Sequence, residues 1–188
     1  MRLVIAAICL TLCVVLQPSS ARADLGVGQR FPNVTFSGAL SAADRAYLGL
    51  TRPGPFSLKD IQAKYLLVEI FSDSCPHCIW AAPGVNRLFR LIEKNPRLQG
   101  KDGQPAVLKM LGVGFYGKAA AMEVWRIKYD VPFPLIPDPR AEVGKALDIP
   151  GIPTYVLLDQ QGRVVFVHAG EISSPRQFLQ KILSHLEF

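Results

Sequence analysis

The chain has 188 residues, of which 49% are hydrophobic, and this composition fits one globular domain and excludes a disordered chain. The formal net charge is +6, but the sequence has no run of Lys and Arg and no interleaving of basic and aromatic residues. We therefore expect no nucleic-acid partner.

The first 23 residues form a distinct segment. An early arginine precedes the apolar run LVIAAICLTLCVVL (3–16), and small residues stand at Ala21 and Ala23. This pattern is typical of a secretory signal peptide, and the run is shorter than the roughly 20 residues that span a bilayer. We expect residues 1–23 to be a signal peptide that is cleaved near Ala23, which leaves residues 24–188 as a secreted or periplasmic domain. The alternative is an uncleaved segment that anchors the protein in a membrane.

Two contrasting segments open the expected domain. Residues 24–36 predict a loop and a short strand, and residues 37–61 are rich in turn-forming residues and predict a hairpin or a surface excursion. The run YLLVEIF (65–71) is apolar except for one acid, which is typical of a central strand that is covered on both faces.

A helix is predicted directly after this strand. Ser72, Asp73 or Ser74 would cap it, and apolar residues recur along it up to Ile92. Pro83 lies within the helix and predicts a kink.

The remaining elements alternate between strands and helices. They are a strand at 106–115, a helix at 118–130, a short strand at 133–138, a short helix at 140–149, a hairpin at 154–170 and a C-terminal helix from 174 onward. The hairpin would turn at Gly162, and Ser173 or Ser174 would cap the last helix. This order predicts an α/β sandwich with a central sheet flanked by helices. Trp80 and Phe115 are expected to pack in the core or at its rim.

Cys75 and Cys78 stand where the central strand gives way to the first long helix. Removal of the signal peptide would leave them as the only cysteines of the domain. They close too small a loop to constrain the unfolded chain, so a structural disulfide explains them poorly. At a helix N-terminus, unpaired backbone N–H groups and the helix dipole favour a thiolate, the nucleophilic form. We therefore assign Cys75 as the attacking nucleophile and Cys78, one helical turn on, as the residue that resolves a mixed disulfide.

The two residues between the cysteines, Pro76 and His77, are expected to tune the reduction potential of the pair. A histidine adds a hydrogen-bond donor, or a positive charge when it is protonated, beside the sulfur. It thereby stabilises the thiolate and the reduced form, and a stabilised reduced form makes a more oxidising couple. The alternative is a solvent-exposed histidine with no tuning role.

Glu69 is the single acid of the apolar strand and precedes Cys75 by six residues. Burial would raise the pKa of Glu69 and make it a proton acceptor for the Cys78 thiol during resolution. The alternatives are a surface-facing strand residue or a partner for a lysine.

Two stretches, LLVEIFSDSCPHCIWAAP (66–83) and IPGIPTYVLLDQQGRVVFVHAG (149–170), resemble the segments that build the active site of the thioredoxin fold. The resemblance is strongest to the secreted group that includes TlpA and ResA, and it runs from about Val27 to Phe188. It implies a thioredoxin-like sandwich with a central mixed sheet and an extra strand–helix insertion at 106–130.

The same resemblance implies roles for particular residues. Glu69 matches a buried acid, Pro83 matches the proline that kinks the helix, and Gly170 matches a glycine after the hairpin. Pro153 matches a cis-proline that faces the cysteine pair, and the backbone of Ile152 would pair with the substrate beside its cysteine.

The sequence also departs from the family pattern. Ser74 replaces the tryptophan that usually precedes the first cysteine. The dipeptide Pro76-His77 resembles that of the oxidant DsbA, although DsbA-like chains carry a much larger helical insertion. The direction of electron flow is therefore open, with a tilt toward an oxidant.

The resemblance implies a monomer that needs no cofactor beyond a redox-active disulfide between Cys75 and Cys78, and no metal. Its partners would be protein thiols and disulfides, with apocytochrome c or a membrane electron carrier among the candidates.

Two other activities would use some of the same residues. A copper-binding module would use both cysteines and His168, but copper-binding relatives space their cysteines more widely and a cis-proline stacked on the pair tends to exclude metal. A peroxiredoxin-type peroxidase would use Ser72, but it needs a proline where this chain has Val68. A binding domain with a vestigial cysteine pair ranks last.

Overall fold

The computed structural model describes residues 26–37 and 40–188. The expected signal peptide at 1–23 and its cleavage site near Ala23 lie outside the described residues. The elements in chain order are β1 (Thr35–Phe36), α1 (Ala42–Leu48), β2 (Phe56–Ser57), the short 3-10 helix η1 (Leu58–Asp60), β3 (Ala63–Phe71), α2 (Pro76–Glu93), β4 (Ala106–Phe115), α3 (Ala119–Tyr129), β5 (Leu135–Asp138), α4 (Glu142–Leu147), β6 (Thr154–Asp159), β7 (Val164–Ala169) and α5 (Pro175–Leu183). In the part of the chain that the structure describes, no helix is both long and apolar enough to cross a membrane.

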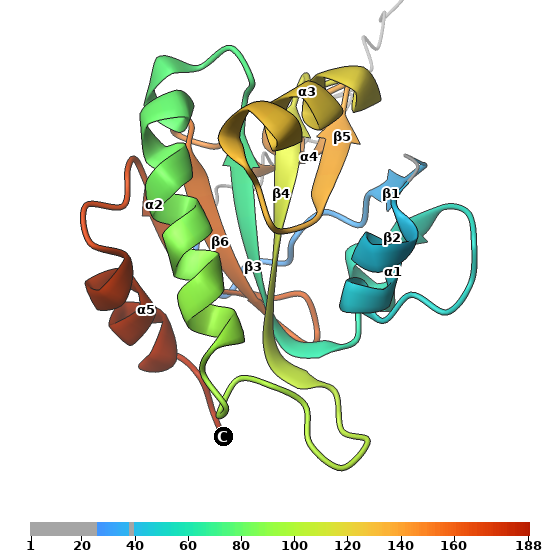
Figure 1. Cartoon of the computed structure of the whole chain (residues 1–188), viewed down its shortest axis with the longest axis vertical. Coiled ribbons are helices and arrows are strands. Elements are labelled where there is room, and N and C mark those ends of the chain that lie inside the picture. The colour runs from blue at the N-terminus through green and yellow to red at the C-terminus, as the bar shows by residue number, and fades with distance from the viewer. Residues whose placement is uncertain (1–25, 38–39) are drawn as a thin grey trace, which may run out of the picture.

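A five-stranded mixed sheet forms the centre of the fold, in the order β5-β4-β3-β6-β7 (Figure 1). Strands β3, β4 and β5 run parallel, whereas β6 and β7 are antiparallel to their neighbours. The connections between the parallel strands contain helices, because a parallel crossover needs a long return path. The antiparallel strands β6 and β7 are joined by a turn at Gly162, which has a positive φ of 74°. The predicted α/β sandwich with a central mixed sheet is confirmed.

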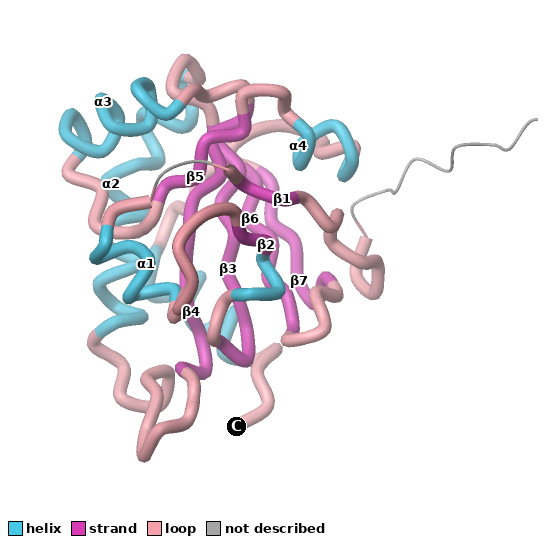
Figure 2. Tube along the Cα trace, turned by 90° about the vertical axis from the view of Figure 1, so that its right-hand side faces the viewer, coloured by secondary structure: helices cyan, strands magenta, loops and turns pink. Residues whose placement is uncertain are grey.

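Strand β3 lies in the middle of this sheet and is covered on both faces. Leu67 and Phe71 point into a core that α2, α3 and α5 cover, whereas Val68 and Ile70 point into a second core with α4 and the N-terminal segments. Figure 2 shows α2 and α3 on one side of the strands and α4 on the other. Burial on both faces explains why β3 is an unbroken apolar run.

The segment between β1 and β3 differs from the expected hairpin or surface excursion. Strands β1 and β2 do pair antiparallel, but the chain between them forms the helix α1, which was not predicted. Ser41 caps α1, because its hydroxyl oxygen accepts a hydrogen bond from the backbone N–H of Asp44 at 3.0 Å. Gly49 ends the helix with a positive φ of 70°.

Helix α1 covers an edge of β4 that the short strand β5 leaves open. Strand β5 pairs with only the last four residues of β4, from Gly112 to Phe115. The backbone N–H of Met110 therefore has no strand partner on that side and donates instead to the Tyr47 hydroxyl oxygen at 3.0 Å. A paired and covered edge is closed to association with other strands.

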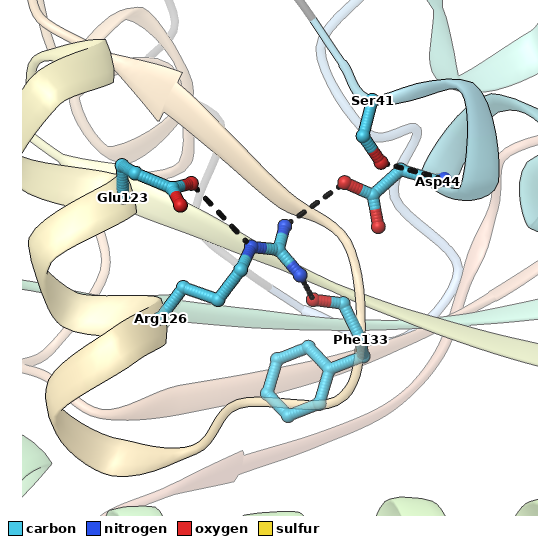
Figure 3. Close-up of polar contacts among 5 residues, drawn as sticks. All are labelled: Ser41, Asp44, Glu123, Arg126 and Phe133. Atoms are coloured by element: carbon cyan, nitrogen blue, oxygen red, sulfur yellow. Dashed lines mark hydrogen bonds and ion pairs between the residues drawn. The ribbon is translucent and has the colours of Figure 1, made fainter.

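A half-buried arginine ties α1 to α3 (Figure 3). The Arg126 guanidinium pairs with the Asp44 carboxylate at 2.9 Å and donates to the Phe133 carbonyl oxygen at 3.1 Å. Glu123 lies 3.9 Å from the Arg126 Nε. The Arg126 and Asp44 side chains are only 26% and 12% exposed, so water screens this pair less than a surface ion pair.

We expect Tyr47→Phe to lower the free energy of unfolding by about 1–3 kcal/mol, because it leaves the buried Met110 N–H without an acceptor. Tyr116→Phe is the matched control, since Tyr116 is exposed, and it should change the value by less than about 0.5 kcal/mol. Urea denaturation of both variants checks this. A Tyr47→Phe protein as stable as the control would show that α1 does not protect this edge.

Candidate active site

The cysteine pair lies where β3 ends and α2 begins. The helix starts at Pro76, and Cys75 itself occupies the N-cap position. The expected caps Ser72, Asp73 and Ser74 were wrong, because the chain first turns with Cys75 N–H donating to the Ser72 carbonyl oxygen at 3.2 Å. The Ser72 and Ser74 hydroxyls bond to each other at 3.1 Å instead of to the helix. The first cysteine therefore takes the place beside the unpaired N–H groups of α2, which runs on without interruption through Pro83.

The two sulfurs differ in their access to solvent. Cys75 and Cys78 form no disulfide in this structure. Cys75 is half-buried, whereas Cys78 is only 1% exposed. Burial raises the pKa of the Cys78 thiol well above its usual range, and the neighbouring Cys75 and Glu69 act in the same direction. Only the Cys75 sulfur is open to a large partner.

The loop before β6 faces the first sulfur. The Ile152–Pro153 peptide bond is cis, as the resemblance implied. The Cys75 thiol donates to the Ile152 carbonyl oxygen across 3.6 Å. The Pro153 carbonyl oxygen in turn accepts a hydrogen bond from the Gly170 N–H at 2.8 Å. The backbone at Ile152 and the Cys75 sulfur thus lie side by side at the surface.

Glu69 is buried behind the pair, with 5% of its surface exposed. Burial raises the pKa of Glu69 to about 8, and a hydrogen bond from Tyr155 opposes this rise. The Tyr155 hydroxyl donates to Glu69 Oε1 at 3.5 Å from the facing position of β6. Its burial shows that the surface-facing alternative is wrong, and within the described residues Glu69 forms no ion pair with a lysine.

His77 projects from the first turn of α2 toward a different partner. Its Nδ1 lies 2.9 Å from Oε1 of Glu171, a residue in the loop between β7 and α5. Its ring also meets the Trp80 ring edge-on, with the ring centroids 5.2 Å apart. Trp80 is 65% exposed, which corrects the expected packing position, because it lies on the outer side of α2 with His77. Phe115 does pack against the core.

Sequence reasoning missed Tyr155 and Glu171. The alternation of β6 offered a signal for Tyr155, because a strand antiparallel to β3 would place every second side chain on the face of Glu69. Glu171 carried only a weak signal, its place directly after Gly170, because its partner His77 is 94 residues away in the chain.

The residues of the two other activities are not brought together. Between Gly26 and Phe188, outside residues 38–39, no cluster of three or more His, Cys, Asp or Glu side chains could hold a metal ion. His168 Nε2 lies 3.4 Å from the Glu171 carbonyl oxygen, and its ring packs on Phe178. Val68, where a peroxidase would need proline, is buried in the core on the far side of β3.

Comparisons with known proteins agree with this geometry. The sequence model of the Redoxin family matches residues 26–182. The fold is similar to a proposed thiol:disulfide interchange protein DsbE from Chlorobium tepidum, with a TM-score of 0.65 and 18% identity over 87% of this chain and 100% of the other. It is similar to the thioredoxin domain of a thiol-disulfide oxidoreductase from Bacteroides vulgatus, with a TM-score of 0.60 and 16% identity over 87% of this chain and 100% of the other.

A secreted Mycobacterium tuberculosis disulfide oxidoreductase homologous to E. coli DsbE is also similar, with a TM-score of 0.54 and 16% identity over 70% of this chain and 90% of the other. No curated protein sequence matches this chain. At these identities the structural likeness establishes the thioredoxin-like fold.

Proposed function

The chain belongs to the Redoxin family, and from this premise we propose that it is a thiol–disulfide oxidoreductase that exchanges disulfides with protein thiols through Cys75 and Cys78. The observation that carries the proposal is the unequal pair of sulfurs at one helix start. Cys75 is accessible beside the Ile152 carbonyl oxygen, and Cys78 is buried one turn further on. A structural disulfide or a simple core cysteine needs neither an accessible sulfur nor a buried acid behind it.

The reduction of a partner disulfide then runs in two steps. The Cys75 thiolate attacks one sulfur of the partner, which forms a mixed disulfide and releases the other partner sulfur as a thiolate. Cys78 gives its proton to Glu69 and attacks the Cys75 sulfur, which releases the second partner thiolate and closes the Cys75–Cys78 disulfide. Two electrons pass to the partner, and the reverse sequence oxidises a partner dithiol.

Glu69 suits the role of proton acceptor because its raised pKa, about 8, lies near the pH at which exchange takes place. The Ile152 backbone suits the role of substrate holder, since an extended segment that carries a cysteine can hydrogen-bond to it beside the Cys75 sulfur. No protein cofactor or metal takes part in this scheme.

We extend the proposal to the compartment of the protein, its substrates and the direction of electron flow. A signal peptide at residues 1–23 would direct the protein to a compartment in which thiols are commonly oxidised. Protein thiols and disulfides are the proposed substrates, and cysteines of apocytochrome c or a membrane electron carrier fit this chemistry. Pro76 and His77 tilt the pair toward oxidation of its partners.

Equilibration with glutathione tests this function. We expect Cys75 and Cys78 to form one disulfide reversibly, with a reduction potential between the values of about −270 mV for thioredoxin and about −120 mV for DsbA. Alkylation of free thiols after acid quenching measures the oxidised fraction. A chain that forms no such disulfide would rule out the proposed function, and a potential at or below that of thioredoxin would rule out the tilt toward an oxidant.

A further inference from the structure

The His77 ring is held on two sides, and neither contact is to a sulfur. Its Nδ1 lies 2.9 Å from Glu171 Oε1, and its ring packs edge-on against Trp80. A carboxylate has only acceptor atoms, so the hydrogen of this bond is on Nδ1. Within the described residues, Glu171 is the only charged side chain that pairs with His77.

The loop that carries Glu171 is itself anchored at the site. Gly170 donates its N–H to the Pro153 carbonyl oxygen at 2.8 Å, and His168 Nε2 lies 3.4 Å from the Glu171 carbonyl oxygen. Ile172 is buried in the core that α2 covers. Glu171 therefore stands between two anchored residues, so its carboxylate faces the start of α2 at little entropic cost.

We propose that Glu171 is a redox-tuning residue that acts through His77. By pairing with the imidazole, its carboxylate holds the ring away from Cys75 and places a negative charge at the start of α2. The cysteine pair is then less oxidising than the Cys-Pro-His-Cys sequence alone implies. This inference rests on the proposed thiol–disulfide exchange.

The direction in which Glu171 shifts the reduction potential follows from the charges near Cys75. Exchange proceeds through the thiolate form of Cys75, which a positive charge stabilises and a negative charge destabilises. Removal of the Glu171 carboxylate takes away one negative charge at the start of α2, and it frees the His77 ring to turn toward the Cys75 sulfur. Both changes favour the Cys75 thiolate, so the reduced form gains stability. Both side chains are partly exposed, at 63% for His77 and 43% for Glu171, so water screens the effect and we expect it to be moderate.

The reaction that reports this change is exchange with glutathione. Two glutathione thiols give two electrons to the Cys75–Cys78 disulfide and leave as one glutathione disulfide, and their two protons pass to the protein dithiol or to solvent. The equilibrium constant of this reaction is the quantity to compare among variants.

The experiment measures that constant at pH 7 for the whole chain, for Glu171→Gln, for His77→Gln and for the double variant. We expect Glu171→Gln to shift the constant about fivefold toward the dithiol, which is about 20 mV for a two-electron couple. When His77→Gln is already present, Glu171→Gln should shift the equilibrium constant less than twofold. Glu187→Gln, which removes an equal charge near the C-terminus at the far end of α2 (Figure 1), is the matched control and should have no effect.

Each contrary outcome has a distinct meaning. If the wild-type chain does not exchange with glutathione at all, the proposed function fails and this inference fails with it. If exchange is normal but Glu171→Gln matches Glu187→Gln, only the role of Glu171 is overturned. An equal shift in the presence and absence of His77 would overturn the claim that Glu171 acts through the imidazole.

Discussion

Cys75→Ser should reduce the rate of disulfide exchange with a protein substrate by at least about a thousandfold, because a serine hydroxyl cannot replace the thiolate nucleophile. Cys75 is the accessible sulfur beside the Ile152 carbonyl oxygen, and the buried Cys78 cannot take over its role. Reduction of insulin, followed by turbidity, measures the loss in one direction. Refolding of a reduced protein measures it in the other.

Cys78→Ser separates the two roles. It keeps the nucleophile and removes the residue that resolves, so a mixed disulfide between Cys75 and the substrate should accumulate. Non-reducing electrophoresis with a cysteine-containing substrate detects this species. Two results would contradict the assignment of nucleophile and resolver. One is a mixed disulfide between Cys78 and the substrate that accumulates in the Cys75→Ser variant, and the other is equal activity of the two variants.

The sheet and its covering helices were largely predictable because their signals are local. Strand β4 has the predicted bounds, Ala106–Phe115, and the apolar run of β3 indicated its central place. The buried Glu69 was also predictable, since an acid inside such a run has no solvent-facing side to occupy. In each case neighbouring residues in the chain determine the structure.

Features that depend on distant residues were not predictable in this way. Helix α1 has only seven residues, too few for a periodic signal, and its stability comes from contacts with Arg126 and the edge of β4. Cys75 takes the N-cap because Ser72 and Ser74 are used in the preceding turn. The His77–Glu171 pair joins two loops that only the folded sheet brings together.

Helix α1 is held in place by residues that are far from it in the chain. The chain between β1 and β3 and the helix α3 meet through Asp44 and Arg126 on the side of β4 that β5 leaves open. This contact closes one edge of the sheet at a distance from the cysteines. The chain between β1 and β3 therefore stabilises the sheet. The loops at 152–153 and 170–172 determine the environment of the cysteine pair.

Glu69→Gln should have opposite effects on activity and stability. The amide cannot accept the Cys78 proton, so resolution of the mixed disulfide should slow by about 100-fold at pH 7. Removal of a buried acid should also stabilise the fold, because burial penalises the carboxylate form that the unfolded chain adopts freely at pH 7. Stopped-flow measurement of disulfide formation and urea denaturation of the reduced protein report the two effects.

The pH dependence gives the sharper test of Glu69. Its pKa is about 8 in the fold against an ordinary value of 4.5, so the folded state binds the proton more tightly than the unfolded state. Below pH 4.5 the carboxyl is neutral in both states and burial carries no ionisation penalty. As the pH rises from 4.5 to 8 the unfolded state ionises first, so wild-type stability falls by about 1.4 kcal/mol per pH unit and then levels off.

Glu69→Gln should lack this slope and exceed the wild-type chain by about 3–5 kcal/mol at pH 8. Tyr155→Phe serves as the matched variant, because it removes the hydroxyl that donates to the Glu69 carboxylate and leaves the carboxyl in place. It should raise the pKa of Glu69 further and move the pH midpoint of the resolution step upward. Identical pH slopes for wild type and Glu69→Gln would mean that this carboxyl is not the buried acid behind Cys78. If Tyr155→Phe leaves the pH midpoint of the resolution step unchanged, the tyrosine does not affect the pKa of Glu69.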